Sequence, residues 1–484
     1  MKYQQLKNYV DGRFVPSEGK PLDVYSPLSG EVISEVPLST ASEVDTAVTA
    51  AKEAFKEWSG WTIKERVQVF YRYRALLEEN KDAIGSLIRE ENGKTSSEAV
   101  AEIEKSMEVA EFACSLPQLV GGETLEVSRG VQCQEERYPL GVVSSITPFN
   151  FPVMVPNWTI PITLALGNTM ILKPSEQVPF GANKIAELLA GSGLPPGVFN
   201  VVHGDRAVVE AICDHPTIRA VSFVGSTRVA EAVYVRVTSQ HKRALCMGGA
   251  KNHLIVLPDA DPAMTAEDVV ASFTGCAGQR CMAAATVVAV GEVDHIIEQI
   301  SLEAQKVVPG ENLGAIISKQ AQERIEHMIA DAIDGGAQPL VDGRQVVVAG
   351  KPNGYYLGPT ILDHVQPEME IAQAEVFGPV LTIIRVADFE EAMSLEAASP
   401  YGNAAAIYTS SGGWARKFSQ RASAGMIGIN IGVPVPREPF SFGGWHRSRF
   451  GVGDITGRSS VDFWTRLKKT TTKWSAEAGV DWMS

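Results

Sequence analysis

The sequence predicts an α/β protein built on parallel sheets, and two observations support this prediction. From about Gly141 onward, helical segments such as NKIAELLAGSG alternate with short apolar segments, which read VVSSITPF, TMILKP, VFNVVHG and AVSFVG. A second run of this kind begins near Asn252 with HLIVLPDADP and continues to about Phe442. Strands that are joined by helices run parallel, and such sheets bind ligands at the carboxyl ends of their strands. We therefore expect the chemistry of the protein at those ends.

The length and composition favour a cytoplasmic enzyme. The chain has 484 residues, of which 45% are hydrophobic and 21% are charged, so it can form two or three well-packed domains. Its net charge of −14 argues against non-specific binding to nucleic acid, which needs a positive surface. No apolar stretch approaches the roughly eighteen residues of a membrane span. The N-terminal segment MKYQQLKNYVDGRF has neither the apolar core of a secretion signal nor an Arg-rich presequence.

The cysteines indicate neither disulfides nor a metal. Six of them are scattered along the chain, at Cys114, Cys133, Cys213, Cys246, Cys276 and Cys281. A disulfide framework is dense and regular, and zinc sites repeat close Cys or His pairs that are absent here. Most of these thiols are expected to be buried structural residues, and one of them is a candidate nucleophile.

The segments outside the two runs also predict regular elements. Asp11-Gly12 predicts a hairpin turn within Tyr9–Val15, and Thr40 and Glu43 form a possible capping box on a helix over Thr40–Trp58. Apolar periodicity predicts further helices over Ile63–Glu91 and Glu98–Pro117. Near the C-terminus, alternating polarity predicts a strand over Phe463–Trp474 that leaves the body of the domain.

Two segments could bind a dinucleotide. SFVGSTRVAEAV (222–233) is a strand, a Gly-Ser turn and a helix, and the free N–H groups of a helix N-terminus suit a pyrophosphate. MILKPSEQVP (170–179) ends a strand with Lys173 and Glu176, and a carboxylate at a strand end can bind ribose hydroxyls while repelling a 2′-phosphate. Taken singly, each segment equally fits an ordinary structural turn.

Three further segments could carry a reaction. In GVVSSITPFNFP (141–152), prolines frame Asn150, whose amide could stabilise an oxyanion or form a structural turn. SFTGCAGQRCMAA (272–284) surrounds Cys281 with small residues and places Arg280 beside it, and a neighbouring cation favours the thiolate. AEVFGPVL (374–381) offers Glu375 and Phe377, which could bind a ribose or lie on the surface.

The order and spacing of these motifs resemble the aldehyde dehydrogenase superfamily. PFNFP, KPSE, a glycine-rich FxGS turn, a GG segment, GQxC and ExFGP follow one another in this order between Pro148 and Pro379, and the resemblance as a whole runs from about Val10 to Trp474, nearly the whole chain. The resemblance implies two Rossmann-type parallel-sheet domains and a small β flap for oligomerisation. The implied NAD-binding domain is 1–122 with 141–247, the catalytic domain is 248–442, and the flap is 123–140 with 455–484.

The resemblance also implies a mechanism and a set of site residues. The thiolate of Cys281 attacks an aldehyde, and the amide of Asn150 and the backbone N–H of Cys281 stabilise the oxyanion. Hydride transfer to NAD leaves a thioester on the enzyme, and this transfer needs no metal. The implied NAD contacts are Thr147, Phe149, Lys173, Glu176, Gln177, Gly225, Ser226, Glu375 and Phe377.

One departure points to a particular branch of the superfamily. Most members read Glu-Leu-Gly-Gly-Lys, in which the glutamate activates the water that hydrolyses the thioester. Here Cys246 occupies that position, and a thiol is a poor general base toward water. GGAKNH, GQRCMA and ITPFNFP resemble the CoA-acylating methylmalonate-semialdehyde dehydrogenases, in which coenzyme A receives the acyl group. The alternative is a hydrolytic enzyme that releases a free acid from another anionic aldehyde, sulfonated or phosphorylated.

That branch binds the substrate carboxylate through arginines. Arg280 matches one of them, but the second position is Lys105, a point charge in place of a planar fork. Three further arginines, Arg437, Arg447 and Arg449, crowd PREPFSFGGWHRSRFG, where they could bind a different acid group or face solvent. A non-enzymatic member of the superfamily is disfavoured because Cys281 and Asn150 are both present.

The resemblance finally implies a homodimer or homotetramer. We expect the strand Phe463–Trp474 of one subunit to pair with a hairpin between Leu125 and Arg137 (EVSRGVQCQEER) of another, because an unpaired strand leaves backbone groups without partners. The alternative is a tail that folds back on its own subunit.

Overall fold

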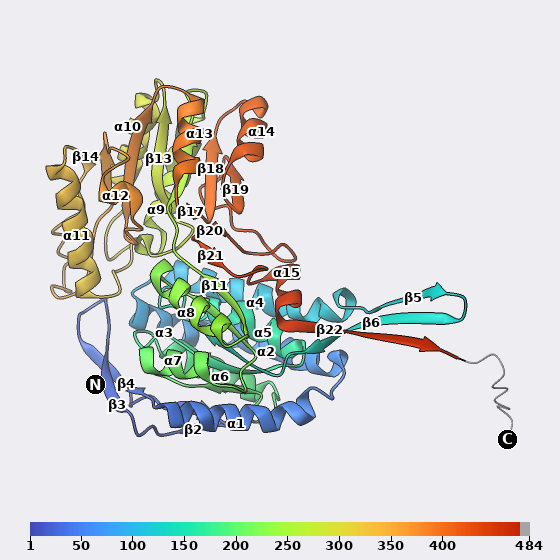
Figure 1. Cartoon of the computed structure of the whole chain (residues 1–484). Helices are drawn as coiled ribbons and strands as arrows, with labels where there is room; N and C mark the ends of the chain where they lie inside the picture. The colour runs from blue at the N-terminus through green and yellow to red at the C-terminus, as the bar shows by residue number, and fades with distance from the viewer. Residues whose placement is uncertain (475–484) are drawn as a thin grey trace, which may run out of the picture.

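The computed structural model describes residues 1–474; residues 475–484 lie outside the described part. The chain forms an eight-stranded sheet and a seven-stranded sheet, with helices packed on both faces of each. The seven-stranded sheet occupies the upper half of Figure 1, and a three-stranded flap projects from the lower half. The predicted α/β fold is therefore confirmed.

The first sheet has the order β2-β1-β9-β8-β7-β10-β11-β21. Its central strands are parallel, whereas the hairpin β1–β2 and the short strand β21 at the two edges run antiparallel to their neighbours. Strands β7 and β8 are buried along their whole length, as expected for a sheet covered on both faces. The strands are β1 (Asn8–Val10), β2 (Arg13–Val15), β7 (Val142–Ile146), β8 (Thr169–Lys173), β9 (Phe199–Val201), β10 (Ala220–Val224), β11 (Arg243–Met247) and β21 (Arg449–Phe450).

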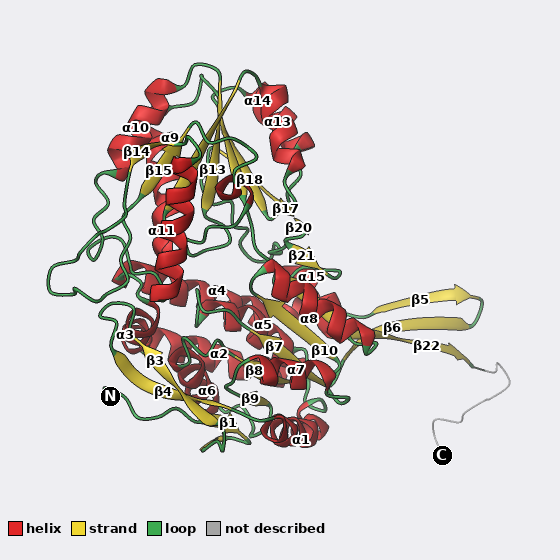
Figure 2. Ribbon diagram, turned by 60° about the vertical axis from the view of Figure 1, so that its left-hand side comes forward, coloured by secondary structure: helices red, strands yellow, loops and turns green. Residues whose placement is uncertain are grey.

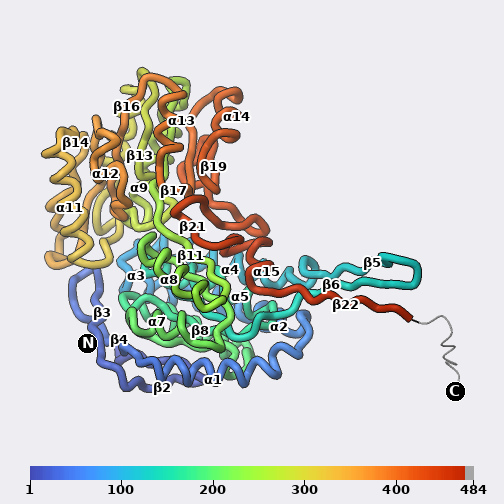
Figure 3. The backbone as a smooth tube through the Cα atoms, in the orientation of Figure 1, coloured from blue at the N-terminus to red at the C-terminus, as the bar shows by residue number. Residues whose placement is uncertain are grey.

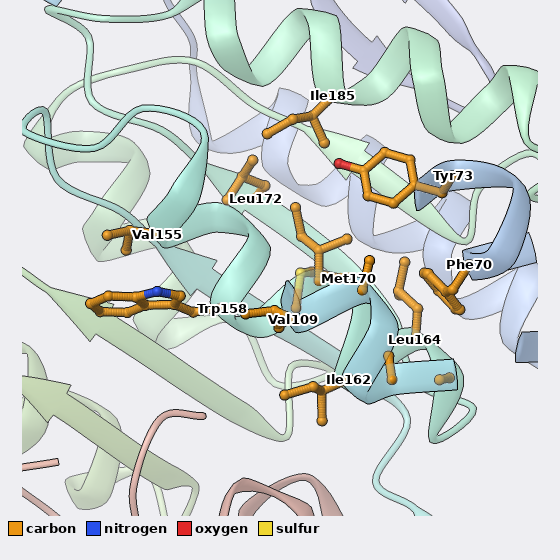
Figure 4. Packing of buried hydrophobic residues seen from close by; sticks show 14 of the residues in the cluster. Phe70, Tyr73, Val109, Val155, Trp158, Ile162, Leu164, Met170, Leu172 and Ile185 are labelled. Carbon is orange, nitrogen blue, oxygen red and sulfur yellow. The ribbon is translucent and has the colours of Figure 1, made fainter. Parts of the chain in front are cut away.

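Two groups of helices cover this sheet. Helices α1, α7 and α8 bury apolar residues against one face, and α2 to α6 with α15 cover the other. Figure 4 shows the second layer, in which Met170 and Leu172 of β8 pack among Phe70, Trp158 and Leu164. Full burial of one such side chain contributes about 1.5–3 kcal/mol. The helices are α1 (Ala41–Trp58), α2 (Ile63–Glu79), α3 (Lys81–Asn92), α4 (Ser96–Leu119), α5 (Met154–Ala165), α6 (Phe180–Gly191), α7 (Arg206–Asp214), α8 (Thr227–Ser239) and α15 (Gly457–Trp464).

The second sheet has the order β14-β15-β16-β13-β12-β18-β19 and is parallel except for β14 at its edge. Its two faces bury separate clusters, one with α9 and α10 and the other with α11 to α14. The strands are β12 (Asn252–Val256), β13 (Ala284–Val290), β14 (Gln338–Val341), β15 (Thr360–Asp363), β16 (Val380–Val386), β18 (Ala404–Tyr408) and β19 (Met426–Ile429). The helices are α9 (Pro262–Thr274), η1 (Gly275–Gly278), α10 (Asp294–Ala304), α11 (Lys319–Asp334), α12 (Glu370–Gln373), α13 (Phe389–Ala398) and α14 (Gly412–Arg421).

The chain passes between the two sheets along neighbouring segments. It leaves the first sheet after β11 and returns at β21, which pairs with β11, so the second sheet is inserted between two adjacent strands of the first (Figure 3). The backbone N–H of Gly248 donates to the carbonyl oxygen of Ser448 at 2.8 Å, and the Ser448 hydroxyl donates to the carbonyl of Gly249 at 2.7 Å. A small pair, β17 (Tyr401–Gly402) with β20 (Trp445–His446), lies beside this crossing.

Two antiparallel units stand outside the main sheets. A hairpin of β3 (Lys20–Tyr25) and β4 (Val32–Leu38) lies near the N-terminus (Figure 2). The flap consists of β5 (Glu123–Ser128), β6 (Val131–Pro139) and β22 (Thr465–Lys473), in the order β22-β6-β5. None of the helices within residues 1–474 is long and apolar enough to cross a membrane.

The flap corrects the predicted exchange of the tail between subunits. β22 pairs with β6 of its own chain from Thr465 opposite Pro139 to Lys473 opposite Val131. The strand begins two residues later than predicted, because Phe463 and Trp464 belong to helix α15. Asn168 Nδ2 donates to the carbonyl of Trp464 at 3.0 Å, and this anchor starts β22 directly beside β6. The segment 457–464 therefore packs in the core and not in the flap.

Other local predictions can be compared directly. The hairpin turn is confirmed, with φ of 51° at Asp11 and 78° at Gly12, the left-handed pair that such turns require. The capping box of Thr40 and Glu43 is present at the start of α1. The single helix predicted over Ile63–Glu91 is wrong, because the chain breaks at Asn80 into α2 and α3. Apolar periodicity continues across that break and therefore does not reveal it.

Candidate active site

The carboxyl ends of β7, β8 and β10 line one cavity of about 610 Å³. This volume suits a cofactor, since ligand sites commonly enclose about 300–1,000 Å³. The structure brings all nine residues predicted to contact NAD to this cavity, although they come from four segments of the chain. They are Thr147, Phe149, Lys173, Glu176, Gln177, Gly225, Ser226, Glu375 and Phe377.

One end of the cavity combines a helix N-terminus with a charged pair. Ser226 is the N-cap residue of α8, and its side chain makes no capping hydrogen bond. The first N–H groups of the helix are therefore open to an anion, as a pyrophosphate site requires. Lys173 Nζ lies 2.8 Å from Glu176 Oε2, at the end of β8.

The other end of the cavity is formed by aromatic rings and a buried carboxyl group. The rings of Phe149 and Phe377 pack edge to face at 5.7 Å between their centroids. Glu375 Oε1 accepts a hydrogen bond from the backbone N–H of Ala250 at 3.0 Å. Burial raises the pKa of Glu375 to about 7, against the opposing effects of this hydrogen bond and of Lys251 and Arg324. This carboxyl group therefore changes its charge near neutral pH.

Cys281 follows a tight loop between α9 and β13. Cys276, Ala277 and Gly278 have φ values of 55°, 53° and 69°, so the loop winds left-handed. A Cβ atom at Gly278 would lie 2.0 Å from the carbonyl oxygen of Gly378, so only glycine fits there. The nucleophile loop therefore packs backbone to backbone against the loop that carries Glu375 and Phe377.

The surroundings of Cys281 keep its thiol protonated in this state. Removal from water, and next the negative charge of Glu375, raise the pKa of Cys281 to about 12, although backbone N–H groups and Arg280 act in the opposite direction. Arg280 Nη2 donates to the carbonyls of Ala271 and Ser272 at 2.7 and 2.8 Å. A neutral thiol is a weaker nucleophile than a thiolate, so its activation needs loss of a proton.

Asn150 is held next to the nucleophile loop. Its Nδ2 donates to the carbonyl of Gln279 at 2.9 Å, which leaves one N–H of the amide free. Its own carbonyl accepts from Lys94 Nζ at 2.7 Å, and Lys94 forms a buried ion pair with Glu102. Glu102 Oε1 in turn accepts from the backbone N–H of Val153 at 2.8 Å. This ion pair fixes the segment that carries Asn150.

A second cavity, of about 360 Å³, lies on the other side of Cys281. Both cavities are lined by Cys281, and Phe151 and Trp158 also border both. The second cavity is mostly apolar, with charged residues from α4 and from the segment before Phe442. Its charged lining residues are Glu98, Glu102, Lys105, Arg280, Arg437 and Glu438. Two molecules, one bound in each cavity, would therefore meet at the sulfur atom of Cys281.

Besides Arg280, four cations were predicted at or near this cavity, and their positions differ. Lys105 lines the cavity, but its Nζ lies 2.5 Å from Glu438 Oε2 and 3.0 Å from Glu108 Oε2, so its charge is already neutralised. Arg437 also lines it and pairs with Glu108. Arg447 and Arg449 lie elsewhere, paired with Glu231 and Asp454 respectively.

Cys246 does not reach either cavity. It lies within β11, fully buried in the cluster between the first sheet and helices α1, α7 and α8. Burial raises its pKa well above the ordinary range. The position predicted to replace the general base therefore offers no proton acceptor to the site.

Sequence reasoning missed several residues of the site. Arg324 of α11 lines the first cavity and donates to the carbonyl of Val376 at 2.7 Å. Lys94, Glu102 and Glu438 were also missed, because each acts through a partner that is distant in the chain. Only Glu438 had a signal, its position next to Arg437. Within residues 1–474, no group of three or more His, Cys, Asp or Glu side chains is arranged to hold a metal ion.

Comparisons with known proteins agree with this geometry. The sequence model of the aldehyde dehydrogenase family matches residues 14–470. Malonate-semialdehyde dehydrogenase 1 of Geobacillus kaustophilus (strain HTA426) is 44% identical over 476 residues, which cover 97% of each chain. Malonate-semialdehyde dehydrogenase 2 of Bacillus mycoides (strain KBAB4) is 43% identical over 480 residues, 97% of this chain and 99% of that protein.

Two solved structures superimpose closely. The methylmalonate-semialdehyde dehydrogenase of Oceanimonas doudoroffii has a TM-score of 0.97 and 40% identity, and the match covers 98% of this chain and 99% of that one. An NAD complex from Sinorhizobium meliloti 1021, which also bears the name of a methylmalonate-semialdehyde dehydrogenase, has a TM-score of 0.97, 39% identity and 99% coverage of both chains.

Proposed function

The chain belongs to the aldehyde dehydrogenase family, and we propose that it oxidises a short acidic aldehyde of the malonate-semialdehyde or methylmalonate-semialdehyde class with NAD and transfers the acyl group to coenzyme A. The observation that carries this proposal is the position of Cys281, which lines both the cofactor cavity and the smaller cavity beyond it. A nucleophile at that junction can hold an aldehyde next to a bound nicotinamide.

The residues of the larger cavity fit NAD. The uncapped N-terminus of α8 with Gly225 and Ser226 suits the pyrophosphate, and Lys173, Glu176 and Gln177 suit the adenosine ribose. Glu375 suits the second ribose, with Phe149 and Phe377 at the nicotinamide end. NAD bound there supplies the acceptor for the hydride that oxidation of an aldehyde releases.

The other steps belong to side chains of this protein. Cys281 loses its proton and attacks the aldehyde carbon, and the resulting oxyanion is stabilised by the free N–H of Asn150 and by the backbone N–H of Cys281. The Lys94–Glu102 ion pair keeps Asn150 in place. Once the aldehyde is oxidised, its acyl group remains on Cys281 as a thioester.

Coenzyme A is favoured over water as the acyl acceptor because each described carboxylate that lines the smaller cavity already has a partner, while Glu375 on the cofactor side is assigned to the ribose. Among the described residues of the smaller cavity, Glu102 is paired with Lys94, Glu438 is paired with Lys105, and Glu98 accepts the backbone N–H of Cys276 at 2.5 Å. Cys246 is buried elsewhere. Hydrolysis needs a base that activates water, whereas a thiol attacks a thioester readily without a strong base.

The acidic group of the substrate is assigned to Arg280. Its guanidinium lines the smaller cavity beside Cys281, and only Nη2 is hydrogen-bonded to protein carbonyls. Its buried Nε has no partner within the described part of the chain. A half-buried guanidinium whose Nη1 binds no protein acceptor among the described residues suits a carboxylate, which it attracts by its charge and can bind by a charge-assisted hydrogen bond.

We further propose that the chain forms a homodimer or homotetramer through its flap. The strands β5 and β22 are both edges of the flap, and Leu125, Val127 and Leu467 on them are exposed. Exposed apolar side chains on an edge strand favour pairing with another chain. The flap 123–140 with 465–474 is thus separate from the NAD-binding region, 1–122 with 141–247, and from the catalytic region 248–442.

A product assay tests the proposed function. The enzyme is supplied with NAD and malonate semialdehyde, with and without coenzyme A, and NADH, free acid and CoA thioester are quantified. The proposal expects sustained NADH formation only with coenzyme A, and one CoA thioester for each NADH. Equal turnover without coenzyme A, with free acid as the product, would replace it by the hydrolytic function.

A further inference from the structure

Four charged residues form a chain of ion pairs at one end of the aldehyde cavity, which we call the mouth cluster: Lys105, Glu108, Arg437 and Glu438. Lys105 Nζ lies 2.5 Å from Glu438 Oε2 and 3.0 Å from Glu108 Oε2. Arg437 Nη1 lies 2.6 Å from Glu108 Oε1. Two cations thus meet two carboxylates, and the cluster carries no net charge.

The pair at the centre of this cluster is shielded from solvent. The side chain of Glu438 is 7% exposed and that of Lys105 is 17% exposed. Their neighbours on the cavity wall are apolar, among them Val435 and Phe442. A charge in such surroundings acts on a ligand more strongly than a surface charge does, because little water screens it.

Arg280 differs from Lys105 in having no carboxylate partner among the described residues. Its Nη2 atom binds two backbone carbonyls, but its Nε is buried without a partner in the described part of the chain. The ammonium of Lys105, in contrast, already contacts two carboxylates. The attraction that the cavity offers to an anion therefore comes from Arg280, close to the nucleophile, and not from the mouth.

We propose that Glu438 is a specificity-determining residue, which neutralises Lys105 and so limits the cavity to aldehydes with one anionic group, held at Arg280. This inference rests on the proposed function for the position of the aldehyde. A second negative charge on the substrate would lie toward the mouth, where the neutral cluster offers no attraction to offset its loss of hydration. Removing the charge of Glu438 leaves the mouth with one net positive charge, which attracts anions in proportion to their charge.

The variant Glu438→Gln tests this with three small aldehydes that differ in charge: propanal, malonate semialdehyde and phosphonoacetaldehyde. The proposal expects kcat/KM to change less than about twofold for propanal, to rise about tenfold for the monoanion, and to rise further for the dianion, since one unit charge in a partly shielded site acts on an anion by about that factor and acts more strongly on a dianion. Glu438→Asp, which keeps the charge, should preserve the wild-type order of the three aldehydes.

A double variant distinguishes two roles of Lys105: an ammonium group neutralised by Glu438, and an ammonium group that binds the substrate anion directly. Lys105→Gln alone leaves Glu438 without its cation. The kcat/KM for malonate semialdehyde, divided by that for propanal, should therefore fall about tenfold. Lys105→Gln combined with Glu438→Gln removes both charges. The ratio of kcat/KM for malonate semialdehyde to that for propanal should then return to within about threefold of the wild-type value. If Lys105 bound the substrate itself, the double variant would be as poor as Lys105→Gln, and the proposal would be overturned.

Alkylation of Cys281 gives a readout that does not depend on the proposed substrate. The rates with iodoacetate and with neutral iodoacetamide are measured by mass spectrometry of the peptide that contains Cys281. Glu438→Gln should raise the iodoacetate-to-iodoacetamide ratio about tenfold. The control is Glu104→Gln, which removes one negative charge from α4 away from the mouth cluster, where Glu104 pairs with Lys81, and should leave the ratio unchanged.

The outcomes distinguish the two proposals. An unchanged alkylation ratio in Glu438→Gln, or an equal change for neutral and anionic reagents, overturns the role of Glu438. A wild-type enzyme that does not oxidise malonate semialdehyde, but whose variants shift the alkylation ratio as expected, leaves the role of Glu438 standing and contradicts the proposed function alone.

Discussion

Replacing Asn150 by alanine isolates the contribution of one oxyanion donor. The side chain donates one N–H to the carbonyl of Gln279 at 2.9 Å and keeps the other for the reacting oxygen. Loss of a single such donor typically lowers turnover about 10²–10³-fold, which corresponds to about 2.7–4 kcal/mol. The backbone of residue 150 is held separately, because its carbonyl accepts from Lys94 Nζ at 2.7 Å. We therefore expect lost catalysis on an intact site.

Steady-state NADH formation measures the loss, and fluorescence titration with NAD measures whether the cofactor still binds. The Kd for NAD should stay within about threefold, since the other contacts with NAD lie on different segments. The unpaired carbonyl of Gln279 should cost about 1–3 kcal/mol of unfolding free energy, which a denaturation curve reports. Asn150→Asp preserves the shape but offers no N–H, so it should be equally slow. Turnover within threefold of the wild type in either variant would remove Asn150 from the mechanism.

Four other predictions follow from the site and the flap. Cys281→Ala should abolish dehydrogenase activity and retain NAD binding, as seen by titration; residual turnover would point to another nucleophile. NAD should be preferred over NADP, because the Glu176 carboxylate repels a 2′-phosphate; kcat/KM with both cofactors checks this, and Glu176→Gln should narrow the difference. The pKa of Glu375 is about 7, so its carboxylate is lost as pH falls through that value, and NAD should bind more weakly at about pH 6 than at about pH 8; Glu375→Gln should bind NAD without this pH dependence. Deleting residues 465–484 removes β22 and should yield monomers or aggregates, and a native mass in light scattering would contradict assembly through the flap.

The sequence predicted the features that are encoded locally. The cap of α1 and the turn at Asp11-Gly12 depend on neighbouring residues only, and both are present. The residues predicted to contact NAD all line one cavity. Seven of them end or follow β7, β8 or β10, whose carboxyl ends converge at one edge of the first sheet, whereas Glu375 and Phe377 lie in the loop before β16 of the second sheet.

The features that the sequence did not predict depend on distant partners. Lys105 was expected to face the substrate, but its charge is neutralised by Glu438, which is remote in the chain and close in space. The first two residues of the predicted C-terminal strand, Phe463 and Trp464, instead end helix α15, because Asn168 binds the carbonyl of Trp464 and Arg243 Nη1 donates to the carbonyl of Phe463 at 2.9 Å. Alternating polarity alone does not distinguish these two outcomes, since tertiary contacts override weak local preferences.

The insertion of the second sheet between β11 and β21 means that the first sheet cannot be completed until the second sheet has been synthesised. Cys246 of β11 pairs with Phe450 of β21, and the whole second sheet is synthesised between them. During synthesis, the edge of β11 therefore stays uncovered until nearly all of the chain has been made. An open strand edge is prone to pair with other chains. A ribosome that stops anywhere within the second sheet releases a first sheet with this edge exposed, so truncated products of this gene are expected to aggregate rather than to persist as half-enzymes.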